Sequence, residues 1–119
     1  MDRNNPIASL TKDFAMRIVK LYKFMTEEKR EYVMSKQVLR SGTSIGANVR
    51  ESIYAQSRAD FVSKMSIALK ESGETEYWLE LLHEAEYIDD KAYESISNDN
   101  SKISATLINI IKKAKEPKE

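Results

Sequence analysis

Glu80 and His83 are the residues whose types and spacing come nearest to a catalytic centre. They form a Glu-x-x-His pair, and a helix places such a carboxylate and imidazole on one face, as in di-iron carboxylate bundles. A di-iron centre needs a second such pair and two further inward-facing glutamates, whereas the chain has a single His. We therefore interpret the pair as a surface feature and expect no metal and no other cofactor.

Other routes to catalysis are poorly represented in the sequence. Glu51 and Glu74 could form a buried acid pair, but a hairpin of the helices that carry them would hold them far apart along its axis. The sequence has no Cys nucleophile, no glycine-rich phosphate loop and no Ser/His/Asp set. We expect that the protein is not an enzyme.

Positive charge is the remaining chemical feature. The net charge is zero, yet residues 1–60 hold 11 Lys/Arg against 7 Asp/Glu, and residues 61–119 hold 8 against 12. Contacts with nucleic acid need cations that can reach phosphates. The candidates are Lys12, Arg17, Lys20, Lys23, Arg50 and Arg58. The same cations could simply solvate the surface, so a nucleic-acid partner and a protein partner both remain open.

The elements that must position these residues are helices. The chain length of 119 residues favours one domain spanning 1–119. No proline interrupts the chain between Pro6 and Pro117, and apolar residues recur with helical spacing. Helices are expected at about 7–27, 31–56, 58–87 and 90–115. Short connections between long helices make neighbours antiparallel, which predicts an all-α, up-down-up-down four-helix bundle.

The turns before the last two predicted helices carry capping signals. Ser57 or Arg58 lies at the start of the third helix, and Asp89 or Asp90 can cap the fourth. The chain has no Cys, no apolar run near the ~18 residues of a membrane span and no signal-peptide segment. These features favour a cytoplasmic protein without a membrane partner.

The stretch RSGTSIGANVRES, residues 40–52, places two glycines inside the second predicted helix. Each interior Gly costs roughly 1 kcal/mol of helix stability relative to Ala. Gly42 falls on the core face with Ile45, and Gly46 falls at the edge of that face. Because the apolar spacing continues through the glycines, we predict an unbroken helix that another helix approaches closely, rather than a loop.

Charged residues on helices two and three predict how the two helices align. If they form a hairpin that turns near 57–58, Glu51 lies opposite Lys64, and Arg40 reaches Glu71 or Glu74. Such complementary pairs would fix the register of the hairpin, although solvated surface charges contribute only about 0–1 kcal/mol a pair. Both interpretations stay open on charge alone.

Helix three carries more apolar surface than one buried face requires. Ile67, Trp78, Leu81 and Ala85 lie off its main stripe, on the flank shared with Lys64. A second apolar face that includes the single Trp is typical of a partner surface. We therefore predict an oligomer.

Residues 40–82 resemble the four-helix-bundle family of 23S rRNA intervening-sequence proteins, which is related to the accessory variability determinant proteins of diversity-generating retroelements. The residues that match the family pattern are Arg40, Ser44, Ile45, Asn48, Glu51, Phe61, Lys64, Ala68 and Glu74. The chain departs from the pattern at Gly46 and Arg50, where Pro or Ala is usual, and at Ser52, where Gly is common.

The resemblance implies an antiparallel bundle that assembles into a ring-like homo-oligomer, commonly a homopentamer. It also implies a link to rRNA, or, for the retroelement members, binding of a reverse transcriptase and nucleic acid through a basic surface. The zero net charge differs from those strongly basic members. We expect a non-enzymatic oligomeric accessory protein that binds RNA, DNA or a ribonucleoprotein partner. The alternative is an oligomeric scaffold that binds another protein.

Overall fold

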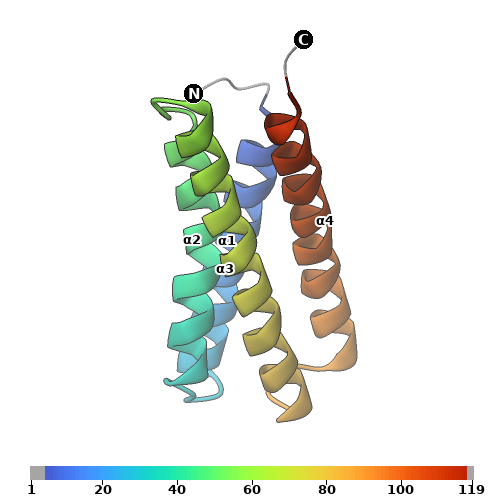
Figure 1. Cartoon of the computed structure of the whole chain (residues 1–119). Helices are drawn as coiled ribbons and strands as arrows, with labels where there is room; N and C mark the ends of the chain where they lie inside the picture. Colours follow the sequence, from blue (N-terminus) through green and yellow to red (C-terminus); the bar gives the residue numbers. More distant parts are fainter. Residues whose placement is uncertain (1–4, 118–119) are drawn as a thin grey trace.

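The computed structural model describes residues 5–117, which form four helices and no strand (Figure 1). Consecutive helices run antiparallel in a bundle that measures 54 × 23 × 21 Å. The helices are α1 (Pro6–Glu27), α2 (Met34–Ser52), α3 (Arg58–Glu84) and α4 (Asp90–Lys115). The predicted four-helix bundle is confirmed.

Three of the helices begin at side chains that accept hydrogen bonds from the first turn. Asn5 accepts from the N–H of Ala8 ahead of α1, and Pro6 occupies the first helical position, where no N–H is needed. Ser57 and Asp89 cap α3 and α4 in the same way. Ser57 and Asp89 are therefore the capping residues among the predicted alternatives.

Helix α2 is shorter than the predicted 31–56. At its start the carboxylate of Glu31, which lies outside the helix, accepts hydrogen bonds from the N–H groups of Val33, Met34 and Ser35 at 3.0, 2.9 and 2.7 Å. Residue 31 therefore caps α2 instead of belonging to it. At the other end, residues 53–55 form successive i→i−3 turns, which end the helix at Ser52.

Helix α3 ends at Glu84, earlier than the predicted residue 87, in a hydrogen-bonded turn. Tyr87 N–H donates to the carbonyl of Leu82 at 2.9 Å, and Glu86 N–H donates to the carbonyl of His83 at 3.0 Å. This pair of bonds is a Schellman motif, which usually has Gly at the position that Glu86 occupies. Glu86 accordingly has a positive φ of 65°.

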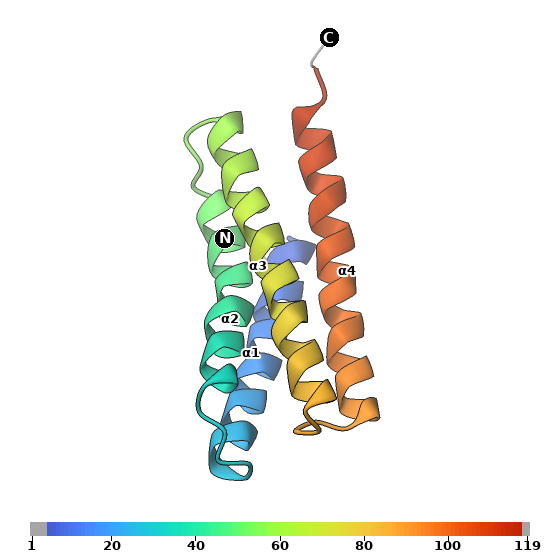
Figure 2. The same ribbon diagram turned by 60° about the horizontal axis from the view of Figure 1, so that its bottom comes forward.

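The core is made by one apolar stripe from each helix, and α1 and α2 pack especially closely. A Cβ added at Gly42 would lie 2.7 Å from Cγ1 of Ile18, and one at Gly46 would lie 3.3 Å from the carbonyl oxygen of Thr11. The unbroken α2 and the close helix approach were both predicted from the two glycines. By contrast, the contact of α1 with α4 is the least extensive of the four helix pairs, and α4 stands mainly beside α3 (Figure 2).

Candidate functional site

The predicted cations do not form one surface. Lys12 and Arg50 line a groove of about 280 Å³ between α1 and α2, whose floor includes Gly46. Arg17 instead joins α1 to α4: its Nη1 lies 2.7 Å from Oδ2 of Asp99, and its guanidinium also donates to the backbone and hydroxyl oxygens of Ser95. The packing role of Arg17 removes it from any free cationic patch.

The remaining cations of α1 lie toward the other end of the bundle. Lys20 lines a separate groove between α1 and α4, and Lys23 is exposed one turn further along. The candidate cations of α1 therefore have different neighbours: Lys12 lines the groove with α2, and Lys20 lines the groove with α4.

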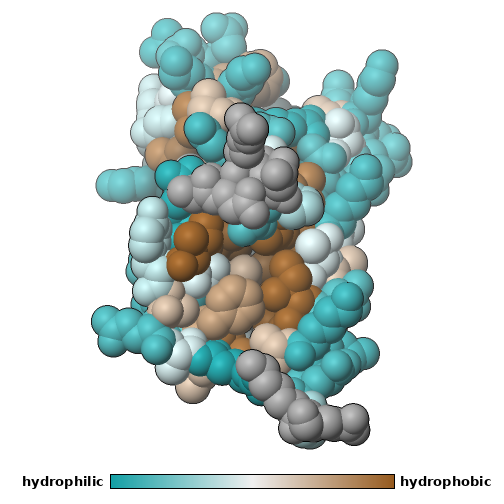
Figure 3. Space-filling view, turned by 90° about the horizontal axis from the view of Figure 1, so that it is seen from above, coloured by the Kyte–Doolittle hydropathy of each residue, from teal (hydrophilic) through white to brown (hydrophobic). Residues whose placement is uncertain are grey.

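A second group of cations gathers at one end of the bundle. Nη1 of Arg58, at the start of α3, donates to the carbonyl oxygen of Glu116 at 3.3 Å, which places it beside the end of α4. The last turn of α4 carries three lysines. We call this group the basic end; it comprises Lys12, Arg50, Arg58, Lys112, Lys113 and Lys115. Seen from this end, hydrophilic side chains surround a central apolar area (Figure 3).

Sequence reasoning missed the lysines of α4 as part of a site. Their stabilising effect on the end of α4 can be predicted from the sequence, because cations interact favourably with the negative pole of a helix. Their proximity to Arg58 depends on the antiparallel arrangement, which brings the end of α4 to the start of α3. The antiparallel topology, which the sequence predicts, would have been enough to place these lysines near Arg58.

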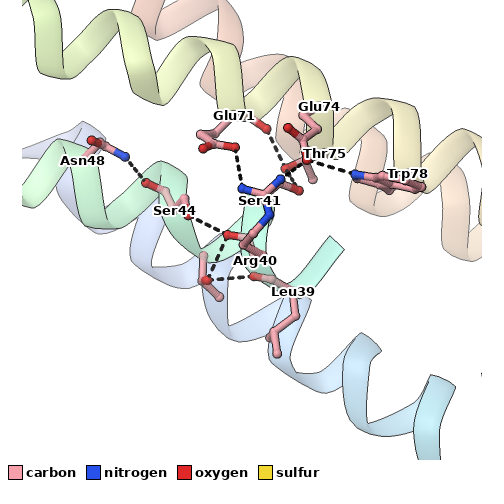
Figure 4. A network of polar contacts seen from close by, with 10 residues as sticks. Leu39, Arg40, Ser41, Ser44, Asn48, Glu71, Glu74, Thr75 and Trp78 are labelled. Carbon is pink, nitrogen blue, oxygen red and sulfur yellow. Dashed lines mark hydrogen bonds and ion pairs between the residues drawn. The ribbon is translucent and has the colours of Figure 1, made fainter. Parts of the chain in front are cut away.

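The predicted charge pairs between α2 and α3 are formed, and Figure 4 shows those of Arg40. Arg40 pairs with both Glu71, at 3.4 Å, and Glu74. Glu74 also accepts from Nε1 of Trp78 at 3.1 Å. Toward the other end of the hairpin, Nζ of Lys64 lies 3.5 Å from Oε1 of Glu51. The register predicted from a turn near 57–58 is thereby confirmed.

The other residues of the family pattern on α2 serve the helix itself. The hydroxyl of Ser44 donates to the carbonyl of Arg40 at 2.6 Å, and Nδ2 of Asn48 donates to the carbonyl of Ser44 at 2.9 Å (Figure 4). Ile45 is fully buried in the core. None of these three side chains is directed at a cleft.

The outer face of α3 exposes two large apolar side chains among polar ones. Ile67 is 39% exposed and Tyr77 is 54% exposed. Trp78 and Leu81 are half-buried, and the Trp78 ring meets the ring of Tyr77 edge to face. Gly73 has open space where its side chain would be. Of the predicted flank, Ile67 and Ala85 are exposed, whereas Trp78 and Leu81 are half-buried. Tyr77 lies on the side of α3 that faces α4, in a groove with Gly73.

The two residues of the Glu-x-x-His pair have different surroundings. Nε2 of His83 lies 2.6 Å from Oδ1 of Asp90, and its ring stacks on Tyr93 at 4.4 Å, while Glu80 is exposed. Within residues 5–117 there is no cluster of three or more His, Asp or Glu side chains arranged to hold a metal ion.

A polar seam joins α3 to α4 beside this histidine. Glu76 accepts hydrogen bonds from the hydroxyls of Tyr93 and Ser97, and the buried pair Ser72 and Asn100 bond to each other. The hydrogen bond to Glu76, together with burial, raises the pKa of the Tyr93 hydroxyl. The seam aligns α3 and α4 with polar groups that are all satisfied.

This combination of fold and interhelical pairs agrees with the comparison to known families. The family of the 23S rRNA-intervening sequence protein matches residues 3–109. The chain belongs to this family. The match covers α1, α2 and α3 and most of α4, and it confirms the family to which residues 40–82 pointed.

A similar protein of known structure has the same fold. It is a protein of unknown function from the S23 ribosomal protein family of Bacteroides thetaiotaomicron VPI-5482, whose crystal structure was determined at 1.70 Å. It is 61% identical, with a TM-score of 0.88 over 89% of this chain and 98% of that chain. No protein of curated function matches. In the present chain, no helix within residues 5–117 is long and apolar enough to cross a membrane.

Proposed function

We propose that this protein is a non-enzymatic accessory protein that binds structured RNA through its basic end. The observation that carries the proposal is the collection of six Lys/Arg side chains, from all four helices, at one end of the bundle. Cations grouped in this way can contact successive phosphates, which supply most of the affinity for nucleic acid. The family name, which refers to a sequence within 23S rRNA, supports RNA as the ligand.

Acidic side chains near the basic end are partly engaged by the protein itself. Glu51 is paired with Lys64, and Asp60 accepts a hydrogen bond from the N–H of Gln56. Their charge is therefore partly offset within the protein. A chain of zero net charge can in this way present a local positive surface.

We further propose that the protein works as a ring-like homo-oligomer, with a pentamer favoured. The exposed side chains of Ile67 and Tyr77, with open space beside Gly73, supply an apolar face on α3 that a second copy would cover. A ring repeats the basic end once per subunit, so that one RNA molecule could contact several copies.

RNA binding can be tested with two charge-reversed variants that differ only in location. Lys12→Glu/Arg58→Glu changes the basic end, and Lys36→Glu/Lys91→Glu makes the same change in charge at exposed positions of the opposite end. Three of the four substitutions place an acid in the first turn of a helix, where it is stabilising, and Lys12 lies one turn further along α1. Unfolding would therefore not explain a loss of binding.

The assay is a mobility shift with a structured RNA at ~50 and ~200 mM salt, the range over which phosphate contacts weaken steeply. We expect the basic-end variant to lose at least tenfold in affinity and to show a smaller salt slope, by about 1 for each phosphate contact removed. The opposite-end variant should stay within about threefold of wild type. Equal losses in the two variants, or no wild-type binding at ~50 mM salt, would reject the proposal.

The assembly is tested by size-exclusion chromatography with light scattering. Wild type should elute near five times its 13.7 kDa mass. Ile67→Glu/Tyr77→Glu should shift it toward the monomer without loss of helix content, because both side chains are exposed. Ile108→Glu, a control at an equally exposed apolar position on α4, should leave the oligomer intact. A wild-type monomer at micromolar concentration refutes the oligomer.

A protein-binding scaffold is the second candidate function, favoured by the same apolar face of α3. It differs in its expected outcomes: the oligomer would form, but RNA would not bind at any salt concentration.

A further inference from the structure

The end of the bundle opposite the basic end contains a cleft of about 700 Å³. It lies between the end of α1 and the turn that joins α3 to α4, and its walls include Leu21, Phe24, Tyr87 and Ile88. The volume falls within the range of small-molecule sites, which combine apolar walls with a few polar groups.

Acidic groups dominate the polar side of the cleft. Glu86, Asp89 and Asp90 lie on the α3–α4 turn and the start of α4, and Lys29 is the one cation among the lining residues. Asp90 is held by His83, and Oδ1 of Asp89 caps α4. The negative pole of α3 and the positive pole of α4 meet at this turn, so the carboxylates and not the helix poles set the sign of the charge here.

The cleft already accommodates one ammonium group. Nζ of Lys29 lies 5.6 Å from the centre of the Phe24 ring, within the range of a cation–π contact. Phe24 is 43% exposed, so the rest of its surface is open to a ligand. The wall therefore favours a positively charged group that is attached to an apolar body.

Glu86 keeps its carboxylate at the cleft at the expense of backbone stability. Its φ of 65° is in the left-handed region, which disfavours residues other than Gly by about 1–2 kcal/mol. Gly would close the same Schellman turn more easily. The Glu86 side chain is exposed and lines the cleft, so its carboxylate is open to a ligand.

We infer that this cleft binds a small organic cation, an ammonium ion carried on an aromatic or branched apolar body. The apolar body lies against Phe24 and Tyr87, and the ammonium group faces Glu86 and Asp89. This site is at the opposite end of the bundle from the basic end, so cation binding and RNA binding can be tested independently.

The experiment compares two probes of similar shape and opposite charge. Phenethylamine and 3-phenylpropionate are titrated separately into the isotopically labelled full chain, and amide chemical shifts are followed by NMR. Phenethylamine should bind with a Kd on the order of millimolar, as expected for a ligand with so few non-hydrogen atoms. Its shift changes should map to residues around 21–29 and 83–92. The acid should bind at least tenfold more weakly.

Two neutralised variants locate the interaction. Glu86→Gln/Asp89→Asn removes two carboxylates from the cleft while an amide oxygen retains the cap of α4, and it should weaken phenethylamine binding about tenfold. Glu27→Gln/Glu28→Gln makes the same change in charge on residues at this end that do not line the cleft, and it should change the Kd less than twofold. Phe24→Ala should also weaken binding, because it removes the ring.

The inference is overturned if phenethylamine and 3-phenylpropionate bind equally, or if neither shifts the cleft amides at tens of millimolar. Equal losses in the two neutralised variants would also overturn it, since they would show general attraction to an acidic surface instead of a site.

Discussion

Replacement of Gly42 by Ala tests whether the close packing of α1 on α2 requires a glycine in the middle of α2. Ala normally stabilises a helix interior by roughly 1 kcal/mol relative to Gly. Here the new Cβ would lie 2.7 Å from Cγ1 and 2.9 Å from Cγ2 of Ile18. Real Cβ atoms do not approach so closely, and these two atoms are attached directly to the Cβ of a fully buried side chain. The helices must therefore move apart.

Overpacking of this kind costs about 1–3 kcal/mol, which exceeds the gain in helix propensity. We expect Gly42→Ala to lower the free energy of unfolding by about 1 kcal/mol, equivalent to roughly 3–6 °C in Tm for a domain of this size. Gly73→Ala is the matched control, because no atom lies within 4 Å of its added Cβ. It should raise the free energy of unfolding by about 1 kcal/mol.

The helix-propensity gain is common to both substitutions, so the difference between them, about 2 kcal/mol, measures the steric conflict. Denaturant unfolding followed by far-UV circular dichroism gives both values, at equal protomer concentration because association would alter stability. In an Ile18→Ala background, where the clashing atoms are gone, Gly42→Ala should become stabilising. If Gly42→Ala stabilises wild type as much as Gly73→Ala does, the close-packing explanation is wrong.

Three further predictions concern other contacts. Burial opposes ionisation of Glu31, but hydrogen bonds from three backbone N–H groups outweigh it and lower the pKa of Glu31 below its ordinary value. The charged form therefore stabilises the fold at neutral pH, and this contribution is lost as the pH falls through the lowered pKa. Glu31→Gln should cost about 1 kcal/mol at pH 7, with a smaller difference from wild type at pH 3, as measured by urea unfolding at each pH. Asn100→Leu should cost about 1–3 kcal/mol because it leaves the buried hydroxyl of Ser72 without its partner, and adding Ser72→Ala should recover part of the loss in a double-mutant cycle. Glu86→Gly should raise Tm, by relief of about 1 kcal/mol of backbone strain, while it weakens phenethylamine binding.

The parts of the structure that could be predicted from sequence are those set by local spacing. The helical period located all four helices, and the position of one turn together with the rise of a helix placed Arg40 opposite Glu74. The start of α2 was mispredicted because Glu31 acts as its cap from outside the helix, and Glu is not among the usual capping residues. The partner of Arg17 could not be inferred, because Asp99 lies 82 residues away and meets it only after α1 and α4 pack.

The grouping of charge was harder to predict, because each end of the bundle brings together residues from four helices that are far apart in the sequence. The excess of cations in residues 1–60 indicated positive charge without showing which cations lie together. In the folded protein Arg58 lies beside the end of α4, and Lys12 and Arg50 line one groove at the same end. Acidic residues of the α3–α4 turn and the start of α4 line the cleft at the other end.

Helix dipoles distinguish which of these charges the fold itself explains. Arg50 and the lysines of α4 lie at helix ends, where cations stabilise the helix, so stability alone accounts for them. Arg58 lies at the start of α3, where a cation is unfavourable, and Glu84 and Glu86 lie at the end of α3, where acids are unfavourable by about 0.3–1 kcal/mol each. Exposed Lys36 and Lys91, at the starts of α2 and α4, and Glu27, at the end of α1, oppose the helix dipole in the same way. An unfavourable dipole contact therefore does not by itself indicate a ligand. Arg58 and Glu86 are distinguished by their surroundings: Arg58 lies beside the end of α4, and Glu86 lines the cleft.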